Sequence, residues 1–303
     1  MKKVLIDFVP TPIGDLIATV PYLDKYREEK GCDIYVSLFN EDLSVLFGET
    51  YPLIKFLKKT DTIDCEETIV IEYNFSKKEN KSIQSIFAEE LGFVDPPYIR
   101  PRISIPTAER KIKSKYISIG VHSTLQYKYW NHPQGKRVQP DSPNWNELCG
   151  LIRKKGYTPV VLERDEMFGV APYWNGLPRK SNKKIGQSLL ETIEYIYHSE
   201  FYVGLSSGMA WVAHALGKPV VMISNFTEDW NEFDLSIGDY KRITNKFVCH
   251  GCYNNYNESD YLKSKEAKSW YSCPRHENTK RQFECHTSIT PEMVFNEIKD
   301  WLK

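Results

Sequence analysis

Four cysteines near the C-terminal end of the chain have the residue type and spacing of a metal site. Cys249 and Cys252 form a Cys-x-x-Cys pair, and Cys273 and Cys285 follow further along the same polar and aromatic stretch. Four thiolates suit a tetrahedral zinc ion or a single iron ion in a sulfur-only site. Because protein ligands would fill every position, we expect a structural ion and no catalytic metal. Disulfides or plain thiols are the alternatives.

A carboxyl group near the N-terminus is the second candidate. Asp15 stands in segment 12–16, Pro-Ile-Gly-Asp-Leu, directly after the first predicted strand. Segments at the carboxyl ends of parallel strands are where such sheets bind ligands. Asp15 is therefore interpreted either as a helix N-cap or as a general base that faces a cleft. The sequence has no Gly-x-Gly-x-x-Gly motif, so a dinucleotide oxidoreductase is not indicated.

Segment 120–130, which follows another predicted strand, carries groups suited to a diphosphate. Ser123 and Thr124 supply hydroxyl groups, and Lys128 supplies a cation that could neutralise a pyrophosphate leaving group. The alternative is a solvated loop whose aromatic residues cover apolar surface. Glu163 ends a strand of its own, where it could bind a ribose hydroxyl or lie at the surface.

Small residues at 206–208 separate a predicted strand from a predicted helix. Ser206, Ser207 and Gly208 would expose backbone N–H groups at the N-terminus of that helix, which favours an anion. The alternative is a tight turn between strand and helix, and the two interpretations are compatible.

Alternating strands and helices must position these groups. The first half predicts strands at 3–9, 33–39 and 68–73 and helices at 16–29 and 82–91. The second half predicts strands at 116–121, 159–162, 201–205 and 219–223 and helices at 142–155, 188–198, 208–216 and 290–302. A Pro-rich linker at 96–106 lies between them. We expect two Rossmann-like domains, 1–110 and 111–303, that face an interdomain cleft, with the metal site at 249–285 in the second.

Charge and hydropathy argue against two kinds of partner. The 40 basic residues balance 40 acidic ones, so no net field draws the chain to nucleic acid. No stretch approaches the roughly 20 apolar residues that would span a bilayer. Residues 1–8 carry an acidic residue inside the apolar run, which predicts a first strand rather than a signal peptide. We therefore expect a cytoplasmic protein.

Together these motifs resemble the ADP-heptose:lipopolysaccharide heptosyltransferases, and most closely the bacterial autotransporter heptosyltransferases. The shared motifs are Gly-Asp-Leu at 14–16, Gln-Tyr-Lys-Tyr-Trp-Asn at 126–131, Gly-Leu-Ser-Ser-Gly at 204–208, Ala-Leu-Gly-Lys-Pro-Val-Val at 215–221, Asn-Phe-Thr at 225–227, Glu-Phe at 232–233 and the four cysteines. The resemblance implies a GT-B fold, with a nucleotide sugar held mainly by the second domain.

The resemblance also implies an inverting transfer of heptose from ADP-heptose to an acceptor hydroxyl, that of a protein serine. Asp15 would be the catalytic base, and Lys128 would stabilise the departing pyrophosphate with Thr124 and the amides of 207–208. Glu163 would hold the ribose. In this family the four cysteines bind iron, so the resemblance favours iron over zinc.

Two departures from the family pattern bear on the acceptor. Ser206-Ser207-Gly208 stands where the lipopolysaccharide branch has Asp-Thr-Gly, which argues against lipopolysaccharide as acceptor. The autotransporter branch places an extra region before the Gly-Asp motif that this sequence does not contain, which leaves acceptor and assembly, including a homo-oligomer, open. The alternatives are another nucleotide-sugar donor, a glycan acceptor, or a non-catalytic nucleotide- or sugar-binding protein assembled through its four-cysteine site.

Overall fold

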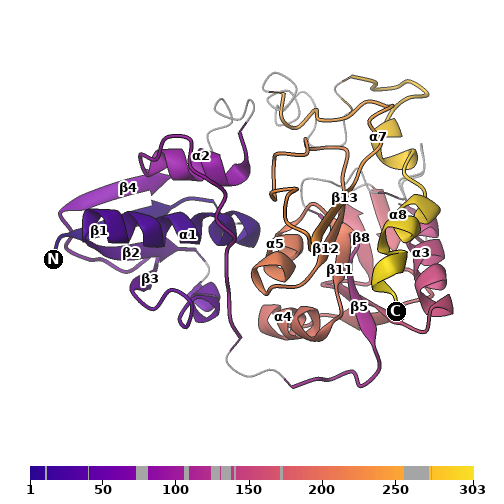
Figure 1. Ribbon diagram of the computed structural model, residues 1–303, viewed down its shortest axis with the longest axis horizontal. Helices are drawn as coiled ribbons and strands as arrows, with labels where there is room; N and C mark the ends of the chain where they lie inside the picture. Colours follow the sequence, from indigo (N-terminus) through magenta and orange to yellow (C-terminus); the bar gives the residue numbers. More distant parts are fainter. Residues whose placement is uncertain are drawn as a thin grey trace.

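Two parallel β-sheets stand side by side along the long axis of the molecule (Figure 1). The computed structural model describes residues 1–10, 12–39, 41–72, 81–105, 109–123, 130, 138–139, 141–170, 173–255, 273 and 275–303. The first sheet lies within the N-terminal third of the chain and the second sheet follows it, as expected for an α/β protein of two successive units. The exact domain division at residue 110 stays a prediction.

The first sheet has the order β3-β2-β1-β4, and its neighbouring strands are parallel. Its elements are β1 (Lys3–Phe8), α1 (Ile13–Lys30), β2 (Asp33–Leu38), the 3₁₀ helix η1 (Glu41–Leu46), β3 (Ile54–Lys58), β4 (Glu67–Ile71) and α2 (Ile83–Glu90). Four of the five predicted elements agree within about two residues. Helix α1 begins three residues earlier than its apolar periodicity predicts, and β3 was not predicted at all.

The early start of α1 corrects the interpretation of Asp15 as an N-cap. The residue before the helix is Pro12, and the backbone N–H of Asp15 donates to the Pro12 carbonyl at 3.2 Å. Asp15 therefore lies inside the first turn, where its carboxylate is favoured by the helix dipole. The helix ends at Gly31, whose φ of 59° lets its N–H reach the Arg27 carbonyl.

The second sheet has the order β10-β7-β5-β11-β12-β13 and is also parallel throughout. Its strands are β5 (Tyr116–Gly120), β7 (Thr158–Glu163), β10 (Asn182–Ile185), β11 (Tyr202–Leu205), β12 (Val220–Ile223) and β13 (Tyr240–Ile243). The helices are α3 (Pro143–Lys154), α4 (Leu189–His198), α5 (Gly208–Ala215), α7 (Glu284–Thr287), α8 (Pro291–Ile298) and the 3₁₀ helix η3 (Lys299–Trp301). A small third sheet joins β6 (Val138–Gln139), β8 (Met167–Val170) and β9 (Tyr173–Gly176). Helix α4 begins with a capping box, in which Ser188 and Glu191 form reciprocal hydrogen bonds.

One apolar core continues from the first sheet into the second. It runs from the buried face of β1 and β2 through α1 to α5, where Trp211 is 3% exposed. A separate core lies on the other face of the second sheet, where Trp130 and Trp145 pack edge to face under α3 and α8. Helix α5 is therefore buried between α1 on one side and β11 and β12 of the second sheet on the other, and it fixes the two halves to each other.

The segment between the sheets is bonded to the same helix. Residues 96–105 form neither helix nor strand, as the Pro-rich composition predicts. The Tyr98 hydroxyl lies 2.7 Å from Nε2 of His214, and Arg100 donates to the His214 carbonyl at 3.2 Å and to Asp239 at 2.8 Å. The Ile103 N–H donates to the carbonyl of Ala215, the last residue of α5. The linker thus holds the C-terminal end of α5.

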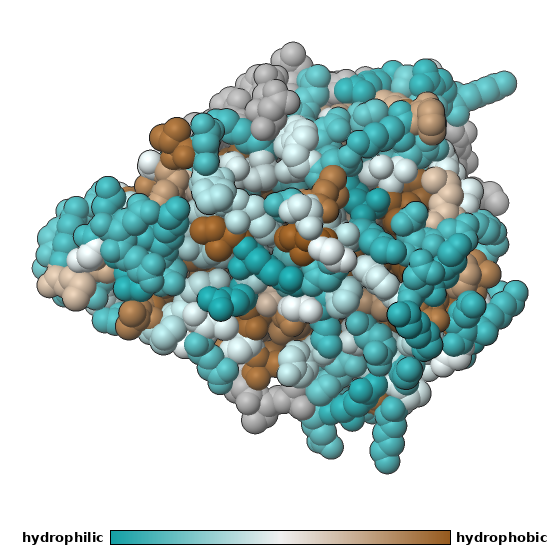
Figure 2. All heavy atoms as spheres, viewed as in Figure 1, coloured by the Kyte–Doolittle hydropathy of each residue, from teal (hydrophilic) through white to brown (hydrophobic). Residues whose placement is uncertain are grey.

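The surface gives no sign of a membrane-spanning element in the part of the chain described. None of the helices there is both long and apolar enough to cross a bilayer. Figure 2 shows hydrophilic residues over most of one face, with hydrophobic residues in small separate groups.

The buried histidine of the linker contact makes stability depend on pH. Desolvation, with a further contribution from Arg100, lowers the pKa of His214 to about 4 from an ordinary value of 6.5. The unfolded chain takes up a proton below about pH 6.5 and the folded chain only near pH 4, so stability is greatest above pH 6.5 and falls as pH drops toward 4. We expect a loss of about 2–3 kcal/mol across that range. Thermal unfolding between pH 7.5 and 4.5 should show a smaller decline in Tm for His214→Gln, and equal slopes would contradict this assignment.

Candidate active site

Three predicted binding residues meet at the carboxyl edge of the second sheet. Strands β7, β5 and β11 are neighbours in that order, so the segments that follow them come together. The Ser123 hydroxyl, after β5, donates to the carbonyl of Ser206, after β11, at 2.5 Å. The His122 N–H donates at 3.2 Å to the carboxyl group of Glu163, the last residue of β7. The sheet therefore gathers at one place the groups that the sequence scatters.

The carboxyl group of Glu163 titrates near neutrality. Burial raises its pKa to about 7, although N–H groups of His122, Arg164 and Val121 lower the pKa by hydrogen bonding to the charged form. A carboxyl group that is half protonated at pH 7 can both donate to and accept from a hydroxyl group. This suits the predicted contact with a ribose, because each ribose hydroxyl group can both donate and accept a hydrogen bond.

The N-termini of α1 and α5 approach each other at two glycines. A Cβ added at Gly14 would lie 3.1 Å from Cα of Gly208 and 3.0 Å from Cδ1 of Trp211. A Cβ added at Gly208 would lie 2.6 Å from Cγ2 of Ile13. A side chain at either position would therefore force the two helices apart.

This contact brings Asp15 to the predicted anion site. Asp15 follows Gly14 directly and is partly exposed, whereas Ser207 and Gly208 begin α5. The Ser207 side chain makes no capping hydrogen bond, so the first-turn N–H groups of α5 keep their capacity to bind an anion. Asp15 and the helix terminus predicted to bind an anion thus lie next to each other, although their residues are far apart in the sequence.

Two predicted residues cannot be placed. Thr124 and Lys128 lie outside the described residues, so their predicted contacts with the diphosphate stay predictions.

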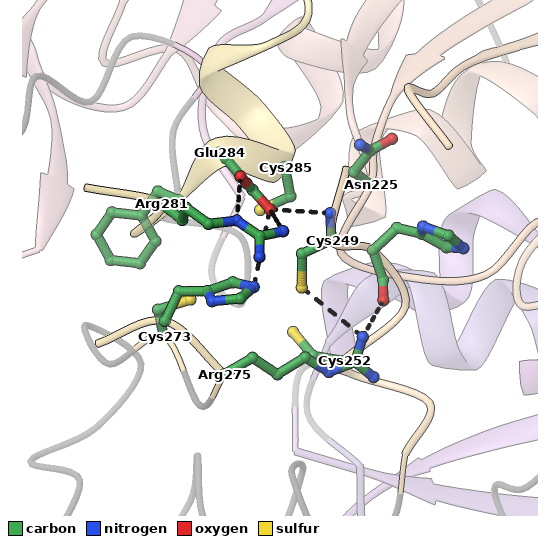
Figure 3. A pocket seen from close by; sticks show the side chains of 11 residues that line it. Asn225, Cys249, Cys252, Cys273, Arg275, Arg281, Glu284 and Cys285 are labelled. Carbon is green, nitrogen blue, oxygen red and sulfur yellow. Dashed lines mark hydrogen bonds and ion pairs between the residues drawn. The ribbon is translucent and has the colours of Figure 1, made fainter. Parts of the chain in front are cut away.

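The four C-terminal cysteines line a single pocket. Cys249 and Cys252 follow β13, Cys285 lies on α7, and Cys273 comes from the chain between them (Figure 3). The turn that carries the first pair is held by Gly251, whose N–H donates to the Asn225 carbonyl at 2.8 Å. The four cysteines thus lie around one pocket, and the predicted metal site itself stays a prediction.

The sulfur atoms do not by themselves form a coordination site. Among the residues that the structure describes, no group of three or more Cys, His, Asp or Glu side chains is arranged to hold a metal ion. The Arg275 guanidinium lies 3.7 Å from the Cys249 sulfur, and Glu284 accepts from the Cys249 N–H at 3.1 Å (Figure 3). The donor set fits iron or zinc, and a bound ion would require the sulfur atoms to draw together.

A buried polar network beneath Ser206 escaped the sequence analysis. The Ser206 hydroxyl donates to Glu232, which pairs with Arg242 at 2.7 Å. In the sequence, Glu232 stood out only as part of the Glu-Phe motif shared with the family, and no function was assigned to that motif.

Comparison with known proteins decides the family. No family model matches the chain. The autotransporter heptosyltransferase Aah of Escherichia coli is 31% identical over 98% of this chain and 74% of its own length. The chain belongs to the autotransporter heptosyltransferase family. The inactive autotransporter heptosyltransferase BimC of Burkholderia thailandensis is 26% identical over 98% of this chain and 68% of its own, so the family's similar members include one without activity.

Solved structures confirm the GT-B fold that the resemblance implies. The iron-containing dodecameric glycosyltransferase TibC of enterotoxigenic E. coli has a TM-score of 0.83 at 28% identity, covering 99% of this chain and 76% of its own. A complex of TibC with ADP-D-beta-D-heptose has a TM-score of 0.82. ADP-heptose lipopolysaccharide heptosyltransferase II of E. coli shares the fold at a TM-score of 0.60, with 11% identity and coverage of 100% and 98%.

The glycine contact predicts the effect of a side chain at Gly14. Gly14→Val would place methyl groups against the Gly208 backbone and Trp211, and should lower the free energy of unfolding by about 1–3 kcal/mol. Chemical denaturation measures the change. Gly48→Val is the matched control, since nothing lies within 4 Å of a Cβ added there. Equal destabilisation by both variants would show that the contact between α1 and α5 is not tight.

Proposed function

We propose that this protein is an inverting glycosyltransferase that transfers heptose from ADP-heptose to the hydroxyl group of a protein serine. The observation that supports the proposal is the contact between Gly14 and Gly208, since Gly14 directly precedes Asp15 and Gly208 is the first residue of α5. Membership of the autotransporter heptosyltransferase family and the likeness to a TibC structure that contains ADP-heptose support the donor.

The proposed reaction needs a base and a stabilised leaving group. Asp15 accepts the proton of the acceptor hydroxyl while its oxygen forms a bond to the anomeric carbon of the sugar. The bond from that carbon to the diphosphate oxygen breaks on the opposite face, and ADP departs with the electron pair. The N–H groups of Ser207 and Gly208, with Lys128 and Thr124, stabilise the charge on the diphosphate. The ribose would bind Glu163.

Removing the base should separate donor binding from transfer. Asp15→Asn keeps the size of the side chain, so we expect ADP affinity close to that of the wild type and transfer at least about a hundredfold slower. Calorimetry measures ADP binding, and mass spectrometry measures sugar added to an autotransporter passenger domain. Asp24→Asn, on the same helix, is the control that changes a carboxyl group paired with Arg27 instead. Undiminished transfer by Asp15→Asn would overturn the role of Asp15.

We further propose that Cys249, Cys252, Cys273 and Cys285 hold one structural iron ion. Their position around one pocket and the iron-containing relative TibC support this proposal. Bound iron would join α7 to the turn at 249–252, and no step of the transfer would pass through it. The dodecameric state of TibC likewise supports a homo-oligomer of this chain.

Loss of a thiolate should lower metal content and stability together. Cys249→Ser or Cys285→Ser should bind less iron, measured by elemental analysis, and unfold at a lower Tm. Cys65→Ser, at a partly exposed position in the first sheet's region, is the control and should keep its iron. Wild-type protein purified without any bound metal would contradict the proposed site.

A second candidate, a non-catalytic nucleotide-binding protein, is favoured by the relative BimC, which is described as inactive. Calorimetric binding of ADP, UDP and GDP, together with the transfer assay, distinguishes the candidates. Selective ADP binding with transfer supports the proposed enzyme. Selective ADP binding without transfer to any acceptor supports the second candidate, and a preference for UDP or GDP changes the donor.

A further inference from the structure

An ion pair is buried beneath the loop that begins α5. The Arg242 guanidinium, from β13, lies 2.7 Å from the Glu232 carboxylate, and their side chains are 2% and 1% exposed. The free energy lost when two charges leave water is about as large as the attraction gained between them, so a buried ion pair by itself is weak evidence of a contribution to stability. The presence of this pair therefore needs an explanation other than stability.

Thr227 and Asp229 also bind the Arg242 guanidinium. Arg242 donates to the carbonyl and the hydroxyl oxygen of Thr227 at 2.6 and 2.7 Å, and the Thr227 hydroxyl donates to Glu232 at 3.0 Å. Asp229 lies 3.3 Å from Nε of Arg242 and pairs with Lys246 toward the surface. Burial lowers the pKa of Arg242, but Glu232 and Tyr240 together outweigh this effect and raise the pKa above its ordinary value, so the guanidinium stays charged.

The remaining partner of Glu232 belongs to the predicted donor site. The Ser206 hydroxyl donates to Oε1 of Glu232, while the Ser206 carbonyl accepts from the Ser123 hydroxyl at 2.5 Å. Ser206 is thus held both at its side chain and at its backbone. The next residue is the N-cap of α5, so whatever fixes Ser206 also fixes the first N–H groups of that helix.

Two apolar side chains of the same volume could fill this space, but they could not accept a hydrogen bond from the Ser206 hydroxyl group. Glu232 accepts from a hydroxyl on one side and from Arg242 on the other, so its carboxylate is oriented by the ion pair. The arrangement therefore serves to aim a hydrogen-bond acceptor at Ser206.

We propose that Glu232 and Arg242 are positioning residues that fix Ser206, and through it the backbone of Ser207 and Gly208, in the conformation that binds the donor diphosphate. The identity of this ligand rests on the proposed function.

Three variants isolate the effect. Ser206→Ala removes the hydroxyl link and leaves the ion pair in place. Replacing one member of the pair would strand a buried charge, so Glu232→Leu, which cannot accept a hydrogen bond, and Arg242→Met are combined. The third variant carries all three substitutions. Lys81→Met with Glu89→Gln, which neutralises an ion pair at α2, is the matched control.

ADP affinity, measured by calorimetry, should fall about tenfold in Ser206→Ala and in the double variant, as for loss of one charge-assisted hydrogen bond. The triple variant should bind no more weakly than either, since both changes break the same link. Ser206→Thr keeps the hydroxyl and should regain most of the affinity lost in Ser206→Ala. Additive losses, or unchanged affinity in Ser206→Ala, would overturn the proposal.

A second measurement does not depend on the ligand. Hydrogen exchange of the amides at 206–209 should be faster in Ser206→Ala and in the double variant than in the wild type or the control. If the wild type binds ADP but neither affinity nor exchange changes, the positioning role is wrong and the proposed function stands. If the wild type binds no ADP, the proposed function fails, and the exchange rates alone decide the positioning role.

Discussion

The approach of two helix N-termini at Gly14 and Gly208 is the constraint on which the site depends. Each glycine leaves no room for a Cβ, so the backbones of α1 and α5 meet where side chains normally keep helices apart. A carboxylate repels an anion, whereas the N–H groups at a helix N-terminus attract one. The proposed reaction needs both groups at one place, the carboxylate for the acceptor hydroxyl and the N–H groups for the leaving phosphate oxygen.

Around this contact, each sheet contributes a different kind of group. The first sheet brings Asp15, the proposed base, which follows β1 and lies in the first turn of α1. The second brings the hydroxyl groups, the carboxyl group of Glu163 and the start of α5 at the ends of β5, β7 and β11. The division follows from parallel topology, because all carboxyl ends of a parallel sheet lie at one edge.

The sequence allowed the inner strands and the site loops to be predicted, since both follow continuous apolar runs. It did not reveal β3, β10 or β13, because these edge strands carry charged residues among their apolar ones. The start of α1 was missed because a contact with α5, rather than apolar periodicity, stabilises its first turn. The pairing of Glu232 with Arg242 depends on the register of β12 and β13, which no local pattern encodes. The cysteine spacing predicted a four-cysteine metal site, and the structure shows the four residues around one pocket without the ligand arrangement of a metal site among the residues described.

Helix α5 is held at its start by α1 and at its end by the linker, through His214 and Ala215. It also packs against β11, β12 and α4 of the second unit, so it is attached to both halves of the protein. One sheet therefore cannot rotate against the other without breaking contacts of α5 with one of them. The spacing between Asp15 and the start of α5 is set by backbone packing at Gly14 and Gly208, so a jaw-like closure of the two sheets would not bring them closer together.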